Sequence, residues 1–258
     1  MLGTFLQICT PIIISSTVGL TTMINSVFAG HMDGSVQIAV VGLSTTCCNM
    51  MVQTVLSGVN CAQDSLTSQA FGADQKHKCG IILNRGLIIQ TLAFLAFATW
   101  PFFFGEKILV SVGIDAEVSR LTQIQMRVTM PGVFFYGHFD LLKKWLASMR
   151  ITFFPMKATI TSSVLYIFLC FLFVVYFDMG IIGLAVALSI KECAQFLMTF
   201  IYCYWSESVS KVLTPLDSES FEGLSEYLKL SISSIMMICA AVWASHLITF
   251  MAGILGVV

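Results

Sequence analysis

The adjacent residues Lys191 and Glu192 are the sharpest candidates for chemistry in this sequence, because they interrupt the middle of an apolar run. They lie about eleven residues into the run 180–205, which in a helix is a depth of about 16 Å at 1.5 Å per residue. A charged group at that depth in a bilayer costs about 2.5–3.5 kcal/mol, so it has to face water or a bundle interior. The pair predicts a substrate or proton site in which Glu192 titrates, or else a structural ion pair with Arg127 or another helix.

A second charged set precedes this pair in the chain. Asp140 lies three residues before Lys143 and four before Lys144, and both spacings place the side chains on one face of a helix. This spacing favours an ion pair at a membrane interface over a role in transport. Arg127 lies one turn before Pro131, which bends a helix and frees a backbone carbonyl. We expect Arg127 to bond that carbonyl or an anionic partner.

Three uncharged or weakly basic residues are further candidates. His246 changes its charge near neutral pH, Trp243 offers a ring face to an organic cation, and Asn25 is a neutral hydrogen-bonding group for a cavity wall. Each has a plainer alternative as a buried, packed or interhelical residue. The nine cysteines form no Cys-x-x-Cys pair, and no histidine has metal-ligand spacing, so we expect no metal. Catalytic motifs are missing, so we expect no enzyme.

The composition places these residues in a membrane protein. Hydrophobic residues make up 57% of the 258 residues and charged residues only 10%, and the mean hydropathy is +0.89. Soluble domains carry about 25% charged residues, and a soluble fold of this composition would expose a large apolar surface to water. The net charge of −1 argues neither for nor against nucleic acid, but the sequence lacks the basic patches that a nucleic-acid binder needs.

The pattern of apolar runs predicts an all-helical, multi-pass membrane bundle of about seven helices, since each run has the roughly 20 residues that a spanning helix needs. The expected spans are 2–29, 36–62, 80–104, 118–147, 152–177, 180–205 and 226–258. The only long polar segment, 206–225, is the best candidate boundary. We therefore expect a six-helix lobe over 1–205, a cytoplasmic linker over 206–225, and the first helix of an incomplete second lobe over 226–258.

The distribution of Lys and Arg predicts the orientation of the bundle. The connections after the second, fourth and sixth spans hold nine of these residues, and those after the first, third and fifth hold two. Loops rich in Lys and Arg stay in the cytoplasm. The N-terminus is therefore expected in the cytoplasm, which is the opposite of a seven-helix receptor.

The segment from Ser57 to Gly80 is the most distinctive motif of the chain. The segment begins at the end of an apolar run and contains Asp64. The apolar pattern is interrupted at Gly72, and a basic turn follows. This order resembles the second-helix pattern of the eukaryotic multidrug and toxic compound extrusion (MATE) transporters. The matching positions are Gly58, Ala62, Asp64, Leu66, Gln69, Ala70, Phe71, Gly72 and Ala73. Pro131-Gly-Val-Phe, followed by Asp140, is similar to the family's fourth helix.

The resemblance implies a fold, a function and a set of partners. Family members have two six-helix lobes around a central cavity and exchange organic cations or drug-like compounds for protons or sodium by alternating access. This chain resembles the first lobe with the seventh helix, in a plasma membrane or an internal, vacuolar membrane. The partners implied are an organic cation, membrane lipid and the coupling ion H⁺ or Na⁺, with no cofactor. The motif residues, including Asp64 and Gln69, are implied to be structural.

The chain departs from the family pattern at positions that carry coupling carboxylates. Ala241 and His246 stand where eukaryotic members have Glu in the seventh helix, and Asn25 stands where bacterial members have Asp. The hypothesis is that Glu192, together with His246, replaces these carboxylates. One alternative is a lipid-linked substrate flippase, whose cationic cavity would combine Arg127 with Lys191. Another is a truncated, non-transporting homologue that at most pairs with a full-length partner.

Overall fold

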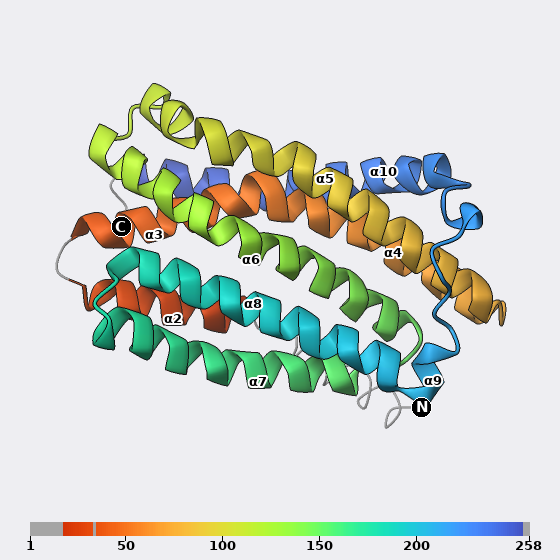
Figure 1. Ribbon diagram of the computed structural model, residues 1–258. Coiled ribbons are helices and arrows are strands. Elements are labelled where there is room, and N and C mark those ends of the chain that lie inside the picture. The colour runs from red at the N-terminus through yellow and green to blue at the C-terminus, as the bar shows by residue number, and fades with distance from the viewer. Residues whose placement is uncertain (1–17, 33–34, 255–258) are drawn as a thin grey trace.

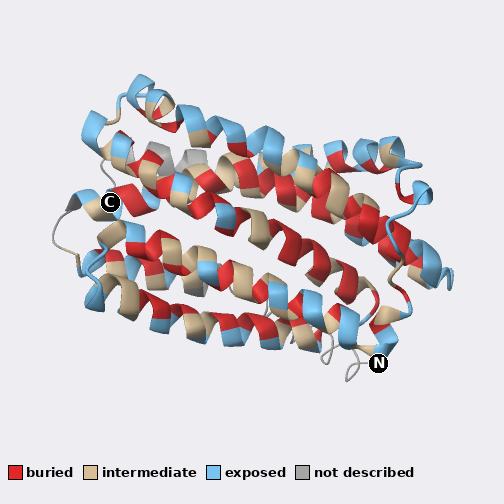
Figure 2. Ribbon diagram, in the orientation of Figure 1, coloured by how far each residue is buried: buried red, intermediate tan, exposed pale blue. Residues whose placement is uncertain are grey.

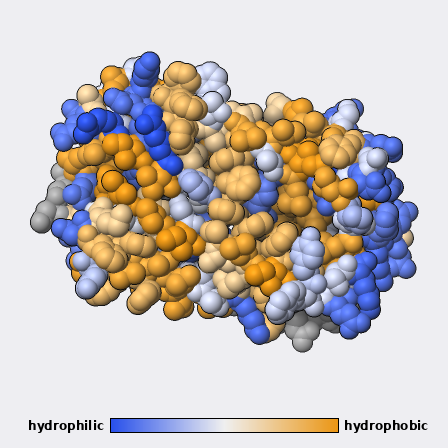
Figure 3. Space-filling view, in the orientation of Figure 1, coloured by the Kyte–Doolittle hydropathy of each residue, from blue (hydrophilic) through white to orange (hydrophobic). Residues whose placement is uncertain are grey.

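The structure is an elongated bundle in which the long helices run along a common axis (Figure 1). It is a computed structural model that describes residues 18–32 and 35–254. Every regular element in these residues is a helix. Apolar side chains cover the middle of the face seen in Figure 3, and hydrophilic side chains gather at the two ends. This distribution is the one that a bilayer-spanning bundle requires.

Within residues 18–32 and 35–254 the chain forms seven helical rods, and short helical turns join some of them. In chain order the elements are α2 (Val18–Gly30), α3 (Ser35–Cys48), the π-helix η1 (Asn49–Gln53), α4 (Thr54–Gly72), α5 (Lys76–Ser111), α6 (Ala116–Ser148), α7 (Phe153–Cys170), the π-helix η2 (Phe171–Tyr176), α8 (Gly180–Trp205), α9 (Glu207–Ser210), the 3₁₀ turn η3 (Ser218–Ser220) and α10 (Leu224–Ile254). Within the described residues, five helices are long and apolar enough to cross a membrane.

The predicted all-helical membrane bundle is confirmed, but two rods are longer than expected. The second span was expected to end at residue 62, whereas α4 continues to Gly72. The polar residues after Asp64 did not end the helix, because Thr67 and Ala70 keep one face of it buried. The turn follows Gly72 and contains Asp74, whose positive φ of 55° reverses the chain. Likewise α5 runs on to Ser111, past the expected end at residue 104.

Close helix crossings hold the bundle together where a residue has no side chain. A Cβ atom added to Gly58 of α4 would lie 2.6 Å from the Cα atom of Ile235, so α10 packs directly on the α4 backbone. A Cβ atom added to Gly132 of α6 would lie 2.9 Å from the Cα atom of Ser189 in α8. Figure 2 shows many buried residues along α4, α6 and α8, whereas the described residues of α10 are mostly exposed or intermediate.

One end of the bundle is basic, and a polar segment is fastened to it. The basic end is the end at which α4 turns into α5 and α6 turns into α7. The connecting segment, residues 206–223, lies there against α5. Asn84 donates from Nδ2 to the carbonyl oxygens of Thr214 and Pro215, both at 3.2 Å, and Arg85 donates to the carbonyl of Glu219 at 2.9 Å. The segment is therefore packed against the bundle rather than extended into solvent.

Candidate functional site

Lys191 and Glu192 form an ion pair in the interior of the bundle. Lys191 Nζ lies 2.7 Å from Glu192 Oε1, and the two side chains are only 7% and 8% exposed. They sit near the middle of the 26-residue helix α8. The expected alternative of a pair with Arg127 is wrong, because the lysine that precedes Glu192 in the chain already neutralises it.

The pair faces a small polar cavity, here called the Lys191–Glu192 cavity, of about 80 Å³. Its walls come from α2, α3, η1, α6, α7 and α8. The residues that line it are Thr21, Asn25, Thr45, Asn49, Gln53, Tyr136, Phe139, Lys143, Thr159, Ser163, Leu188, Lys191, Glu192 and Gln195. The cavity is thus enclosed by most of the rods that form the lobe.

Two oxygen atoms at the cavity are free to accept a ligand. Glu192 Oε2 and Gln195 Oε1 are buried and have no hydrogen-bond partner among the described residues. A buried acceptor without a partner costs about 1–3 kcal/mol, so an ordered water, a proton or a small cation would be stabilised there. A cavity of about 80 Å³ holds a few waters but not an organic ligand, whose sites measure about 300–1,000 Å³.

Asn25 lies in the same cavity and is held by a long-range contact. The residue is 7% exposed and lines the cavity. The Tyr166 hydroxyl, from α7, donates to Asn25 Oδ1. This bond orients the Asn25 side chain, which supplies a neutral dipole where a carboxylate would supply a charge. Asn25, Lys191 and Glu192, which are candidates far apart in the sequence, are therefore brought together.

A second charged network adjoins the cavity through Lys143. Asp140 Oδ1 lies 2.9 Å from Lys143 Nζ, and Oδ2 lies 3.2 Å from Lys144 Nζ, as the i,i+3 and i,i+4 spacings predict. Asn60 of α4 also donates to Asp140 Oδ2 at 2.9 Å. Asp140 is only 4% exposed. It therefore joins α4 to α6 and carries two ammonium groups, one of which lines the cavity.

A π-helical segment completes the wall of the cavity. Asn49 and Gln53, at the two ends of η1, both line it. A π-helix interrupts the regular hydrogen bonds of a helix and often occurs at functional sites. Thr54 Oγ1 donates to the Asn49 carbonyl at 2.6 Å, and this carbonyl also accepts the backbone N–H of Thr54.

The structure does not place the remaining candidates at this cavity. Arg127 is exposed on α6, and its Nε donates to the carbonyl of Phe102 in α5 at 2.9 Å. The expected bond to the carbonyl freed by Pro131 is wrong, because helical side chains lean toward the N-terminus, away from their own carbonyl. Trp243 Nε1 donates to the carbonyl of Met50 in η1 at 3.2 Å. His246 lies in α10, with its side chain outside the described residues.

The motif residues on α4 lie at the packing surfaces and at the basic end. Gly58 faces α10. Asp64 is exposed and accepts a hydrogen bond at 2.7 Å from Ser148, near the end of α6. Gly72 is the last residue of α4. Asp64 therefore ties the ends of two helices together rather than facing the Lys191–Glu192 cavity.

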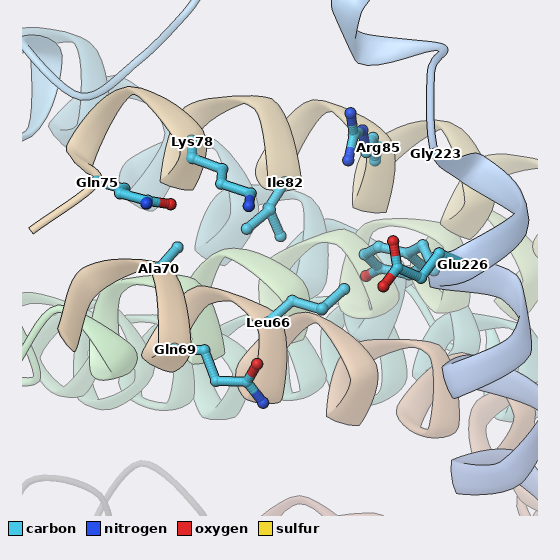
Figure 4. Close-up of a pocket in the computed structure, with 10 residues that line it drawn as sticks. Leu66, Gln69, Ala70, Gln75, Lys78, Ile82, Arg85, Gly223 and Glu226 are labelled. Carbon is cyan, nitrogen blue, oxygen red and sulfur yellow. The ribbon is translucent and has the colours of Figure 1, made fainter. Parts of the chain in front are cut away.

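Gln69 lines a different pocket, of about 220 Å³, at the basic end (Figure 4). The figure shows Lys78 extending from α5 toward α4, with Arg85 and Glu226 near Gly223. The buried Tyr227 also lines this pocket and donates to Gln63 Oε1 at 3.0 Å. The pocket marks where α4, α5 and α10 meet.

Sequence reasoning missed several cavity residues, and only one of them carries a local signal. Gln195 lies four residues after Lys191 and therefore shares its helix face; its Nε2 donates to Thr159 Oγ1 at 2.9 Å. Tyr166 belongs to the site only because α7 packs beside α2, which no spacing in the sequence indicates. Among the described residues, no group of three or more His, Cys, Asp or Glu side chains is arranged to hold a metal ion.

Comparisons with known proteins agree with this arrangement. The family model MatE matches residues 11–172. Multidrug and toxin extrusion protein 1 of Xenopus tropicalis is 29% identical over 240 residues, covering 93% of this chain and 41% of the relative. Protein DETOXIFICATION 10 of Arabidopsis thaliana is 29% identical over 236 residues, covering 90% of this chain and 47% of the relative. The chain spans less than half the length of these relatives.

Solved structures share the fold at low sequence identity. The eukaryotic MATE transporter AtDTX14 superposes with a TM-score of 0.90 at 24% identity, over 98% of this chain and 56% of that one. A MOP superfamily transporter from Pyrococcus furiosus superposes with a TM-score of 0.81 at 18% identity, over 96% of this chain and 54% of that one. These likenesses concern the arrangement of the helices.

Proposed function

The chain belongs to the MatE family of multidrug and toxic compound extrusion transporters, and we propose that it forms the first lobe and seventh helix of an efflux transporter that exchanges organic cations for H⁺ or Na⁺. The proposal rests on family membership and on the extrusion proteins among the relatives. We also propose that the chain lies in a plasma membrane or a vacuolar membrane with its N-terminus on the cytoplasmic side.

The observation that carries the coupling mechanism is the Lys191–Glu192 cavity. Glu192 holds one oxygen against Lys191, and the other has no hydrogen-bond partner in the described part of the chain. A proton or Na⁺ that binds the free oxygen changes the charge balance of the ion pair deep in the lobe. Such a change shifts an equilibrium between two conformations only if the ion binds one of them more tightly. Glu192, together with His246, is therefore proposed to replace the carboxylates that are missing at the positions of Asn25, Ala241 and His246.

The small volume of the Lys191–Glu192 cavity supports separate binding sites for the coupling ion and the organic substrate. About 80 Å³ is far below the 300–1,000 Å³ of organic-ligand sites. The organic cation is therefore proposed to bind outside the lobe interior, in the space that two lobes enclose. Trp243, whose ring is 45% exposed, remains a candidate for stacking on such a cation.

The alternative of a lipid-linked substrate flippase is less well supported. That function needs one cationic cavity, and the sequence offers Arg127 and Lys191 for it. In the structure Lys191 lines the Lys191–Glu192 cavity, whereas Arg127 lines a separate groove between α5 and α6. The two cations do not share a pocket among the described residues, and Lys191 is neutralised by Glu192.

Transport in reconstituted vesicles tests the proposal. Efflux of a fluorescent organic cation, driven by a pH or Na⁺ gradient, is expected for the chain and strongly reduced in Glu192→Gln. Glu207→Gln is the matched control, because Glu207 is an exposed carboxylate paired with Lys211 at 3.0 Å. Unchanged coupling in both Glu192→Gln and His246→Ala would refute the assignment. If the chain transports only beside a full-length partner, or not at all, the non-transporting alternative is favoured.

A further inference from the structure

We propose that a groove between α5 and α6, separate from the Lys191–Glu192 cavity, binds a fatty acid. The carboxylate lies at Arg127, and the hydrocarbon chain lies between the two helices. The Arg127 groove is lined by aromatic and aliphatic side chains, among them Phe94, Leu95, Phe103 and Phe134, and by one charged residue, Arg127. Its volume is about 370 Å³, which lies within the range of about 300–1,000 Å³ for organic-ligand sites.

The hydrogen-bonding state of Arg127 points to an acidic ligand. A guanidinium group has five N–H donors. Arg127 Nε donates to the Phe102 carbonyl at 2.9 Å, and the guanidinium carbon lies 5.6 Å from the Phe102 ring centre. Arg127 makes no ion pair within the described part of the chain. The two terminal nitrogens are left, and their parallel N–H groups match the two oxygens of a carboxylate.

The position of Arg127 along the bundle places these donors near a membrane surface. The residue reaches α5 at Phe102, two residues after Trp100, whose side chain is 58% exposed. Exposed Trp residues mark the interface between lipid and water. Glu106 and Lys107 follow four and five residues after Phe102, about 6–8 Å further along the helix. The guanidinium therefore lies just inside the charged end of α5, opposite to the basic end.

From this level the groove runs inward along both helices. Phe94 lies eight residues before Phe102 on α5, and Phe134 lies seven residues after Arg127 on α6, so the apolar lining extends about 10–12 Å toward the middle of the bilayer. The exposed side chains of Leu95 and Phe103 border it. A fatty acid in the leaflet opposite to the basic end has this geometry: its carboxylate lies at the interface, and its hydrocarbon chain lies in the interior of the bilayer.

The same features argue against other occupants. An organic cation would be repelled by Arg127, which among the described residues is the only charged one that lines the groove. A phospholipid offers a phosphate but brings two chains, whereas the groove is a single cleft between two helices. The start of the second lobe lies elsewhere, because α10 packs on α4 at Gly58. A single-chain carboxylate therefore fits the charge, the depth and the shape of the groove.

Binding of labelled oleate to the full chain in phosphatidylcholine nanodiscs tests the proposal. We expect one saturable site per chain. Arg127→Gln should weaken it about 10- to 100-fold, which corresponds to the loss of hydrogen bonds to a charged group. The oleate affinity of Arg127→Lys should lie between those of the wild type and Arg127→Gln, since lysine keeps the charge but lacks the paired N–H donors. Arg120→Gln is the matched control, because Arg120 is an exposed cation on the same helix that does not line the groove.

A second variant keeps the test decisive if Arg127→Gln does not fold. Thr99 is exposed and lines the groove, so Thr99→Trp should fill it from the lipid side and abolish oleate binding while unfolding is unchanged. Three results would overturn the proposal: no saturable binding, equal affinity in the wild type and Thr99→Trp, or displacement of oleate by phosphatidylglycerol added to the disc at the level of bulk lipid. The last result would assign the groove to a phospholipid.

Discussion

Replacing Asp140 by Ala should destabilise the bundle, because this buried carboxylate binds two lysines and one asparagine. Asp140 accepts from Lys143 at 2.9 Å, from Lys144 at 3.2 Å and from Asn60 at 2.9 Å. Removing one partner of a buried ion pair costs about 3–5 kcal/mol. The lysine side chains are 19% and 23% exposed, so they can extend toward water at the basic end. We therefore expect a loss of about 2–4 kcal/mol.

The free energy of unfolding, measured by titration with a denaturing detergent in mixed micelles, checks this value. Asp74→Ala is the matched control, because the Asp74–Lys76 pair is 3.7 Å long with side chains 88% and 63% exposed. Exposed pairs contribute about 0–1 kcal/mol. Asp140→Asn should cost less than Asp140→Ala, since an amide oxygen still accepts from Asn60. If Asp140→Ala and Asp74→Ala have the same small effect, the reasoning from burial is refuted.

Three further variants test the packing around the site. Gly58→Leu should separate α10 from α4, because even a Cβ atom there meets Ile235 at 2.5 Å; disulfide cross-linking between the two helices should fall. Asn84→Ala should release the connecting segment, since Asn84 bonds two of its carbonyls, and limited proteolysis there should become faster. Tyr166→Phe removes the donor to Asn25 and should weaken coupling-ion binding several-fold without unfolding the chain.

For each of these variants, one result would contradict the expected effect. Gly42→Leu is the control for Gly58→Leu, because a Cβ atom at Gly42 has open space around it; equal cross-linking in both would refute the close crossing. Unchanged cleavage of Asn84→Ala would show that Arg85 alone fastens the segment. A Tyr166→Phe variant with wild-type ion affinity would mean that the orientation of Asn25 does not matter.

The helical architecture was predictable from the sequence because a bilayer requires each spanning segment to be a helix of about 20 mostly apolar residues. In the part of the chain that the structure describes, each of the seven apolar runs contains a helical rod, and a polar pair in the middle of one run had to face inward. The ends of α4 and α5 were not predictable from hydropathy, since helices that project beyond the bilayer stay folded when one face, such as that of Thr67 and Ala70, remains buried.

The cavity itself was only partly predictable. The depth of Lys191 and Glu192 indicated an interior site, but its walls depend on which helices are neighbours. Asn25 and Tyr166 are 141 residues apart in the chain, and no local spacing encodes such a contact. Arg127 shows a different error: its place one turn before Pro131 predicted a bond to the freed carbonyl or to an anionic partner, whereas its side chain is exposed and donates to the Phe102 carbonyl.

Ion-dependent stability of the purified chain tests the central claim most directly, because a ligand that binds only the folded state stabilises it by an amount that rises with the logarithm of the ligand concentration above Kd. The unfolding temperature is compared in Na⁺ and in choline, and at acidic and neutral pH, for the wild type, Glu192→Gln and Glu207→Gln. The account predicts stabilisation by Na⁺ or by acid in the wild type and in Glu207→Gln that is absent from Glu192→Gln. The same ion response in all three proteins would contradict it.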